Sequence, residues 1–352
     1  MYNIQDLLQK MVDEKASDLH LTAGSPPLIR RSGVLVSIGE DKLKPDETLK
    51  LSYSVMNEYQ RKVFEQEKEV DFSFGIGHIA RFRANAYLQR GCVACAIRVI
   101  PLEIKKLTEL GLPKVVSEFA DRQSGLVLVT GATGSGKSTT LAAMIDKINS
   151  ERHEHILTIE DPIEFLHKHR TCLINQREVG SDTNSFGRAL KSALRQDPDV
   201  VLIGELRDLE TMRAALTIAE TGHLTFATLH TNSAVQTINR LVDAFPSDEQ
   251  QTIRAQLAFV LQGVVCQQLI QKRGTKERVP AYEVLICTPA VRALIRDDKV
   301  HQIESYMEVN TKMGMNTLNM CLRDLVRKGD ISEEVALDKS TSPDQLLKLL
   351  TQ

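Results

Sequence analysis

A glycine-rich run from Gly131 to Ser138, GATGSGKS, constrains the fold of this 352-residue chain more than any other feature. It matches the phosphate-binding pattern G-x-x-x-x-G-K-[ST] at every defined position. An apolar run, 126–129, precedes it and a helical pattern, 138–148, follows it, which is the order of strand, loop and helix that the pattern requires. A chance glycine-rich turn would lack this context. The sequence therefore predicts a P-loop in an α/β domain.

The chemistry of this loop predicts which residues bind a nucleoside triphosphate. Glycines let backbone N–H groups approach phosphate oxygens without a Cβ clash, and the helix N-terminus adds a partial positive charge. Lys137 is placed to reach the terminal phosphates, and Ser138 is placed to hold Mg²⁺. The residues predicted to bind ATP are Thr133, Gly134, Ser135, Gly136, Lys137, Ser138 and Thr139.

Apolar runs and helical patterns alternate after Gly125. The runs cover 126–129, 156–159, 200–203 and 224–229. Short, continuous apolar runs between helices are typical of a buried, mostly parallel sheet with helices on both faces. After about Glu283 the apolar residues return at helical spacing, which predicts a helical C-terminal region.

The first 100 residues predict a separate α+β domain, because a chain of this length exceeds one comfortable core. Helices are expected over 4–12 and 46–66, and strands over 17–21, 27–38, 70–74, 81–89 and 93–100. Prolines at both ends of 101–113 indicate a connector. The predicted division is an N-terminal domain, 1–100, a connector, 101–113, a P-loop core, 114–282, and a helical region, 283–352.

Acidic residues follow two of the apolar runs. Glu160 comes directly after the run 156–159, and Glu205 comes two residues after Ile203. Because ligands of open α/β sheets bind at the carboxyl ends of the strands, we expect both carboxylates at the phosphate site. Hydrolysis needs one group to orient or deprotonate water and another to anchor the metal or its waters. Many P-loop ATPases carry an Asp-Glu pair where this chain has Gly204-Glu205, so the residues alone leave the division of these roles open.

Two histidines bracket the run 224–229. His230 follows it, at the expected carboxyl edge, where an imidazole could sense the terminal phosphate through a hydrogen bond and transmit its loss. His223 precedes the run and is a second, weaker candidate. For each histidine the alternative is a structural role, in which the imidazole only satisfies local hydrogen bonds.

Composition excludes several other classes of protein. Lys and Arg number 44 against 46 Asp and Glu, and aromatic content is 5% with no Trp, which argues against a basic, aromatic-lined channel for nucleic acid. The six cysteines are scattered, and the C-x-x-C of Cys92 and Cys95 has no second pair, so packing in a reducing cytosol is expected instead of zinc or disulfides. No export signal or spanning segment is evident, which predicts a cytoplasmic protein without direct membrane insertion.

Four motifs together resemble the secretion-motor ATPase superfamily: a Walker A loop, an acidic box, an unusual Walker B motif and a histidine box. They lie at 131–139, 159–164, 202–208 and 221–232. Within the superfamily the whole chain is similar to the type IV pilus retraction ATPases, the PilT family. The shared segments are Ser17-Asp18-Leu19-His20-Leu21, Arg81-Phe82-Arg83 and Gln176-Arg177-Glu178-Val179-Gly180.

This resemblance implies a homohexameric ring, with a PAS-like N-terminal domain on a RecA-like ATPase domain and ATP bound near subunit boundaries. It implies that Glu160 activates water and that Glu205 supports Mg²⁺, directly or through water. It also implies that arginines of the N-terminal domain reach the nucleotide, and the candidates are Arg81, Arg83 and Arg98. A guanidinium can neutralise charge that develops on phosphates.

The family's activity is ATP hydrolysis coupled to pilus disassembly and twitching motility. The partners it implies are an inner-membrane pilus platform protein, which would hold the ring at the membrane, and an accessory retraction ATPase. Alternatives are a pilus-assembly or type II secretion ATPase, whose extra N-terminal domains and paired C-x-x-C motifs are not found here, and an accessory retraction paralogue. A RecA-like nucleic-acid translocase is a third class, which the composition disfavours.

Two departures from the family pattern stand out. Ala293 replaces an Asn in the C-terminal stretch Ala290-Val291-Arg292-Ala293-Leu294-Ile295-Arg296, although both arginines remain. Ala132 replaces a Pro that is common in the Walker A loop, and we expect no effect on phosphate binding because the glycines and Lys137 are intact.

Overall fold

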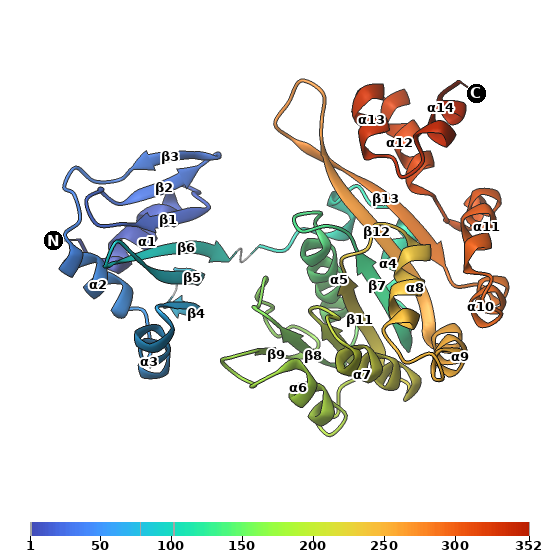
Figure 1. The fold of residues 1–352 in the computed structure, drawn as a ribbon, viewed down its shortest axis with the longest axis horizontal. Helices are drawn as coiled ribbons and strands as arrows, with labels where there is room; N and C mark the ends of the chain where they lie inside the picture. The colour runs from blue at the N-terminus through green and yellow to red at the C-terminus, as the bar shows by residue number, and fades with distance from the viewer. Residues whose placement is uncertain (1, 78, 101–102, 352) are drawn as a thin grey trace. The chain divides into compact units, whose positions relative to one another are not determined.

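The computed structural model describes residues 2–77, 79–100 and 103–351, in two compact units (Figure 1). The N-terminal unit comprises Met1–Glu103 and Glu164–Leu166, and the P-loop unit comprises Ile104–Ile163 and His167–Gln352. Two residues of the predicted connector, Pro101 and Leu102, lie outside the described residues. The four-part division expected from the sequence remains a prediction.

The N-terminal unit is an antiparallel sheet of order β3-β2-β1-β6-β5-β4 with three helices. Its elements are α1 (Ile4–Asp13), β1 (Asp18–Leu21), β2 (Leu28–Arg31), β3 (Val34–Ser37), α2 (Pro45–Tyr53), α3 (Glu58–Glu67), β4 (Glu69–Ile76), β5 (Ala80–Gln89) and β6 (Cys92–Ile100). Alternation along β5 buries Phe82 and Ala84 and turns Arg81 and Arg83 to the other face.

One predicted helix of this unit is in fact two. The expected helix over 46–66 breaks before Asn57, because that side chain caps α3. Its oxygen accepts from the Gln60 backbone N–H at 2.8 Å, and the Gln60 side chain accepts from the Asn57 N–H at 2.9 Å. This capping box is a helix start signal within the predicted helical pattern.

The P-loop unit is built on a seven-stranded sheet of order β13-β12-β7-β11-β10-β8-β9. Its strands are β7 (Gly125–Thr130), β8 (His155–Glu160), β9 (Leu173–Glu178), β10 (Val200–Ile203), β11 (Leu224–Leu229), β12 (Leu261–Gln271) and β13 (Arg278–Ile286). Its α-helices are α4 (Lys114–Phe119), α5 (Lys137–Glu151), α6 (Phe186–Ala193), α7 (Leu209–Glu220), α8 (Ala234–Asp243), α9 (Gln250–Val260), α10 (Pro289–Arg296), α11 (Ile303–Val309), α12 (Leu318–Arg327), α13 (Glu333–Lys339) and α14 (Pro343–Thr351).

This sheet is buried on both faces, as the continuous apolar runs predict. Leu126 and Leu128 of β7 pack on one side with helices α6 to α11, and Val127 and Val129 pack on the other side with α4 and α5. All strand pairs are parallel except β12 with β13. The predicted fold class, an α+β unit followed by a P-loop α/β unit with a helical C-terminal end, is confirmed. Of the helices in the described part of the chain, none combines the length and apolarity needed to cross a membrane.

Three strands of this sheet were not predicted. β9 is an edge strand with the polar sequence LINQRE, which has no apolar run. β12 follows α9 with no intervening turn residue, and its partner β13 extends to Ile286, so the C-terminal helices begin at Pro289 and not near Glu283. The helical positions predicted after that point, around Val291 and Leu322, lie in α10 and α12.

Candidate active site

The carboxyl ends of four parallel strands form one edge of the P-loop unit's sheet. Strand β7, which leads into the P-loop, lies beside β11, then β10, then β8. The pairs Thr130 with Leu229, Ala227 with Ile203, and Ile203 with Ile159 lie in register. The residues that follow these strand ends are therefore neighbours in the order P-loop, His230, Glu205 and Glu160.

The P-loop takes a conformation that requires glycine at both of its critical turns. Gly131 and Gly136 have φ of 141° and 93°, which side-chain-bearing residues rarely adopt. A Cβ on Gly136 would also lie 2.9 Å from the Nε2 atom of Gln267. Gly136 then caps helix α5, whose first residue is Lys137.

The Lys137 ammonium is folded onto the loop. Its Nζ donates to the carbonyl oxygens of Gly131 at 2.7 Å and Ala132 at 3.0 Å, and the residue is 9% exposed. Burial lowers the pKa of Lys137, and the negative charge of Glu205 partly opposes that effect. A cation held at the first turn of α5 reinforces the preference of this site for phosphate.

Glu160 is a buried carboxylate held in one orientation. Its Oε1 accepts from the Thr158 hydroxyl at 2.6 Å and from the Gln176 amide at 3.2 Å, and the residue is 8% exposed. Gln176 comes from β9, which pairs with β8. The sequence marked Gln176 only as part of a family motif, and the structure shows that it orients the acid.

The same motif fixes the turn that follows Glu160. Glu178 is 3% exposed and accepts from the backbone N–H of Ile163 at 3.2 Å and from the Ser181 hydroxyl at 3.3 Å. The backbone N–H of Val179 donates to the Glu160 carbonyl at 2.9 Å. These hydrogen bonds tie the acidic box to β9.

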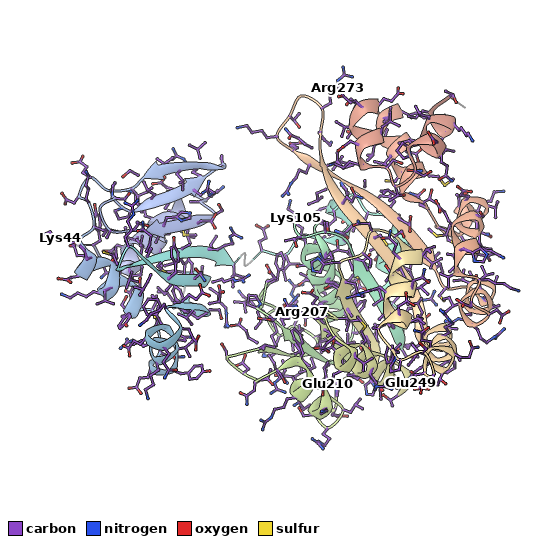
Figure 2. All side chains as sticks on the ribbon, viewed as in Figure 1. Lys44, Lys105, Arg207, Glu210, Glu249 and Arg273 are labelled. Carbon is purple, nitrogen blue, oxygen red and sulfur yellow. The ribbon has the colours of Figure 1, made fainter. Side chains whose placement is uncertain are left out.

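Glu205 lies between the side chains of Arg207 and His230. Its Oε2 accepts from Arg207 Nε at 3.0 Å, and its Oε1 lies 3.2 Å from His230 Nε2. The guanidinium of Arg207, labelled in Figure 2, also donates to Asp161 at 3.2 Å. Hydrogen bonding to Glu205 raises the pKa of Arg207. A chain of polar contacts thus crosses from His230 after β11 through Glu205 and Arg207 to Asp161 after β8. Arg207 is a member that the sequence did not single out.

Gly204 explains the departure from the common Walker B pair. A Cβ at this position would lie 3.2 Å from the Glu160 Cα and 3.3 Å from the Ile159 carbonyl oxygen. A side chain here would require the neighbouring backbone to shift by a few tenths of an ångström, which glycine avoids.

His223 lies at the opposite edge of the sheet from the P-loop. Leu224 is in register with Gly125, so His223 precedes both strands at their amino ends. Its Nδ1 lies 3.0 Å from the Thr221 hydroxyl and 3.1 Å from the Ile218 carbonyl oxygen. At about 3.3 Å per residue the seven steps along β11 separate it from His230 by about 23 Å. The two bracketing histidines do not meet, and the structure does not bring His223 to its own chain's P-loop.

The three candidate arginines share one face of the N-terminal sheet. Arg83 of β5 lies directly opposite Arg98 of β6, and Arg81 is two residues along on the same side. Arg81 donates to the Ser73 hydroxyl at 2.8 Å, and Arg98 forms an ion pair with Asp18 at 2.7 Å. Burial would raise the pKa of Asp18, but hydrogen bonds from Ser17 and Arg98 outweigh it and lower that pKa. Their action on a nucleotide remains a prediction.

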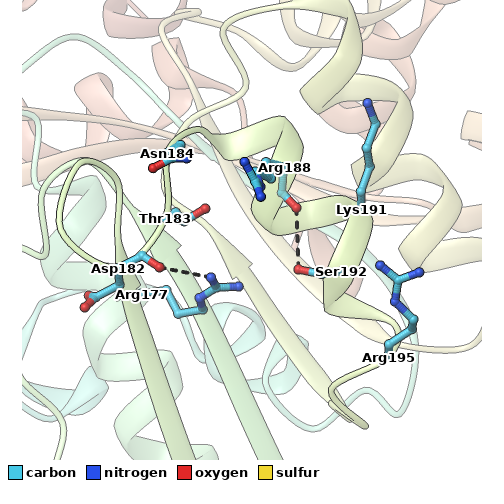
Figure 3. A pocket seen from close by; sticks show the side chains of 8 residues that line it. All are labelled: Arg177, Asp182, Thr183, Asn184, Arg188, Lys191, Ser192 and Arg195. Atoms are coloured by element: carbon cyan, nitrogen blue, oxygen red, sulfur yellow. Dashed lines mark hydrogen bonds between the residues drawn. The ribbon is translucent and has the colours of Figure 1, made fainter.

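A separate hollow beside α6 is strongly basic (Figure 3). Its lining residues are Arg177, Asp182, Thr183, Asn184, Arg188, Lys191, Ser192 and Arg195. Arg177 donates to the Asp182 carbonyl at 3.1 Å, and Lys191 forms an ion pair with Glu210 at 2.6 Å. The residues predicted for ATP do not line it.

Comparison with known proteins identifies the family of this chain. Residues 2–336 match the family model of the type II/IV secretion system protein. The type IV pilus retractation ATPase PilT of Pseudomonas aeruginosa is 52% identical over 342 residues, which cover 97% of this chain and 99% of the relative. A twitching motility protein of Neisseria gonorrhoeae is 45% identical over 345 residues, covering 98% and 92%.

A solved structure gives the same result in three dimensions. The crystal structure of the pilus retraction motor PilT with bound ADP aligns with a TM-score of 0.93 at 49% identity, and the alignment covers 99% of this chain and 100% of that one. The chain belongs to the type II/IV secretion system protein family and, within it, to the PilT ATPases.

Proposed function

We propose that this chain is a motor ATPase that hydrolyses ATP to power the retraction of type IV pili. The observation that carries the proposal is the alignment of a P-loop lysine and two carboxylates, Glu160 and Glu205, along one edge of a sheet. Phosphoryl transfer to water is a matter of positioning and charge stabilisation, which such an edge supplies. The retraction and twitching functions in the relatives' names, and the ADP in the similar crystal structure, support the same function.

Glu160 is the proposed base that orients the attacking water. Its Oε1 is held by Thr158 and Gln176, so the carboxylate has one preferred direction. Water that donates a proton to this group is aligned for attack on the terminal phosphate. The backbone of 133–139 and Lys137 hold the phosphates, and Lys137 exchanges its bonds to loop carbonyls for bonds to phosphate oxygens.

The donor set fits Mg²⁺ bound mainly by the nucleotide. In the part of the chain that the structure describes, no group of three or more His, Cys, Asp or Glu side chains could hold a metal alone. Mg²⁺ prefers oxygen donors and keeps several waters, which suits the Ser138 hydroxyl and a Glu205 carboxylate already paired with Arg207 and His230. The ion supplies neutralisation of charge on the phosphates. Ser138 and Glu205 would hold the ion, Glu205 either directly or through water.

His230 is the proposed phosphate sensor. Its imidazole contacts Glu205 on one side of the site, and α8 begins four residues later. The Thr231 hydroxyl lies 2.7 Å from that of Thr237 within α8, so a shift of His230 is passed to this helix. Arg207 and Asp161 extend the response to the acidic box.

The motor function requires more than one chain. In the proposed homohexamer, Arg81, Arg83 and Arg98 supply positive charge to the nucleotide phosphates, and ATP binding and hydrolysis alternate between closed and open arrangements of the subunits. The ring works in the cytoplasm on an inner-membrane platform protein of the pilus, together with an accessory retraction ATPase. His223 has no role in this scheme within its own chain.

Purified protein tests the enzymatic half of the proposal. We expect release of phosphate from ATP that requires Mg²⁺, disappears in Lys137→Ala and comes from a particle with the mass of six chains. Wild-type protein that binds ADP without hydrolysing ATP would contradict the ATPase activity and indicate a nucleotide-binding scaffold. A stable monomer with full activity would contradict the hexameric ring.

A further inference from the structure

Gln267 of β12 lies directly beneath the P-loop. Cys266 is in register with Thr130, the last residue of β7, so Gln267 is level with Gly131, where the loop begins. The residue is 3% exposed. A buried amide must satisfy both a donor and an acceptor, and here one partner lies in the P-loop and the other in the helix that follows it.

The side chain joins the P-loop to the first turn of helix α5. Its Nε2 donates to the Ser135 carbonyl oxygen at 2.9 Å, in the middle of the glycine-rich run. Its Oε1 accepts from the Thr140 hydroxyl at 2.9 Å, in the first turn of α5. Thr140 is 2% exposed, so both hydrogen bonds are shielded from water, where an unmade bond costs most.

The glycines of the loop pack on the same residue. A Cβ on Gly136 would lie 2.9 Å from the Gln267 Nε2, and a Cβ on Gly131 would collide with the Gln267 backbone oxygen. The P-loop pattern requires glycine for the approach of phosphate. Here the glycines also permit close contact between the loop and β12.

We propose that Gln267 is a positioning residue for nucleotide binding, which holds the P-loop in the conformation that presents its N–H groups to phosphate. This rests on the proposed ATPase function and adds a residue to it. In the described part of the chain the Gln267 side chain hydrogen-bonds to Ser135 and Thr140 and not to Glu160 or Glu205. Gln267 therefore governs the affinity for nucleotide and not the hydrolytic step.

A purely structural role makes a different prediction. A buried amide that only stabilises the core would lower the melting temperature and leave the affinity of the folded protein unchanged. A positioning role raises the Kd for ADP and the KM for ATP while kcat at saturating ATP stays close to that of the wild type.

The sharpest variant is Gln267→Glu, which keeps the shape but places a carboxylate oxygen against the Ser135 carbonyl. Gln268→Glu is the matched control, because the next residue of the strand points to the opposite face. We expect Gln267→Glu to raise the ADP Kd, measured by calorimetry, and the ATP KM by about tenfold or more, as loss of one or two buried hydrogen bonds implies. Gln268→Glu should match the wild type in both.

Thr140→Val keeps the proposal testable if Gln267→Glu does not fold. It removes one hydroxyl donor with little change of shape, and we expect the ADP Kd to rise about threefold to tenfold. An unchanged Kd in whichever of these variants fold, or a fall in kcat without a change in KM, would overturn the role of Gln267. Failure of the wild type to bind ADP would instead overturn the proposed function, so the two failures are distinguishable.

Discussion

Gly204 and Glu160 are in such close contact that a Cβ on Gly204 would lie 3.2 Å from the Glu160 Cα. This contact joins the end of β10 to the end of β8 and sets the spacing between Glu160 and Glu205, the two acids with proposed catalytic roles. It has a direct consequence for turnover, because a shift of a few tenths of an ångström at a catalytic base costs rate before it costs binding.

Gly204→Ala should therefore lower kcat and leave nucleotide affinity unchanged. We expect a loss of about tenfold in kcat, since misplacement of a catalytic group is expensive, with an ADP Kd like that of the wild type. Gly75→Ala is the control, because a Cβ at that position of β4 meets no atom within 4 Å. Unchanged turnover in Gly204→Ala would mean that the neighbouring backbone gives way without moving Glu160.

Glu160→Gln should nearly abolish hydrolysis with ADP binding intact. The amide keeps the size of the side chain but cannot take a proton from water, and loss of a general base typically costs about 10²- to 10⁴-fold in rate. Phosphate release and ADP calorimetry measure the two effects. Glu333→Gln, on the exposed start of α13, is the matched control. If turnover survives in Glu160→Gln, the base assignment is lost.

Arg207→Ala should weaken catalysis by disconnecting Glu205 from Asp161. Arg207 donates to both carboxylates, so its removal leaves the two acids without their shared cation. We expect kcat to fall by roughly tenfold, as for loss of charge-assisted hydrogen bonds. Arg213→Ala removes a different ion pair, with Glu249 on the same unit, and should leave kcat unchanged. Equal effects of the two variants would contradict a specific role for Arg207.

Glu283 should give the fold a measurable pH dependence. This buried carboxylate accepts from the backbone N–H groups of Ala234 at 2.7 Å and Leu318 at 3.4 Å, at the starts of α8 and α12. Burial raises the pKa of Glu283 from 4.5 to about 7. The folded state then binds the proton more tightly than the unfolded state, so this group's contribution to the free energy of unfolding falls as pH rises from about 4.5 to about 7.

Urea unfolding at pH 6 and pH 8 measures this contribution. Between pH 6 and pH 8 the free energy of unfolding of the wild type should fall by about 1 kcal/mol more than that of Glu283→Gln. One pKa unit corresponds to about 1.4 kcal/mol. Comparison with the variant is needed because His167 acts in the opposite sense: burial lowers its pKa to about 4, which makes stability rise with pH. Identical pH slopes in the two proteins would show that Glu283 stays ionised throughout.

The edge that carries the proposed catalytic residues was predictable because it follows from local sequence patterns. Each buried parallel strand is a short apolar run, and the residue after it lies at the same edge as every other strand's end, so Glu160 and Glu205 could be placed from the chain alone. The same rule excludes His223, which the sequence had made a candidate: the strand that brings His230 to this edge places His223 at the opposite edge. Gln267 could not be found this way, since its role depends on pairing between β12 and β7, which are more than 100 residues apart, and β12 carries no isolated apolar run.

Pilus retraction in living cells tests the central claim most directly. Cells that lack this protein would be complemented with the wild type or with Lys137→Ala, and surface piliation and twitching motility would be measured. The account predicts that the deletion leaves cells hyperpiliated and immobile and that only the wild type restores movement. Cells that instead lack pili would contradict retraction and assign the chain to pilus assembly.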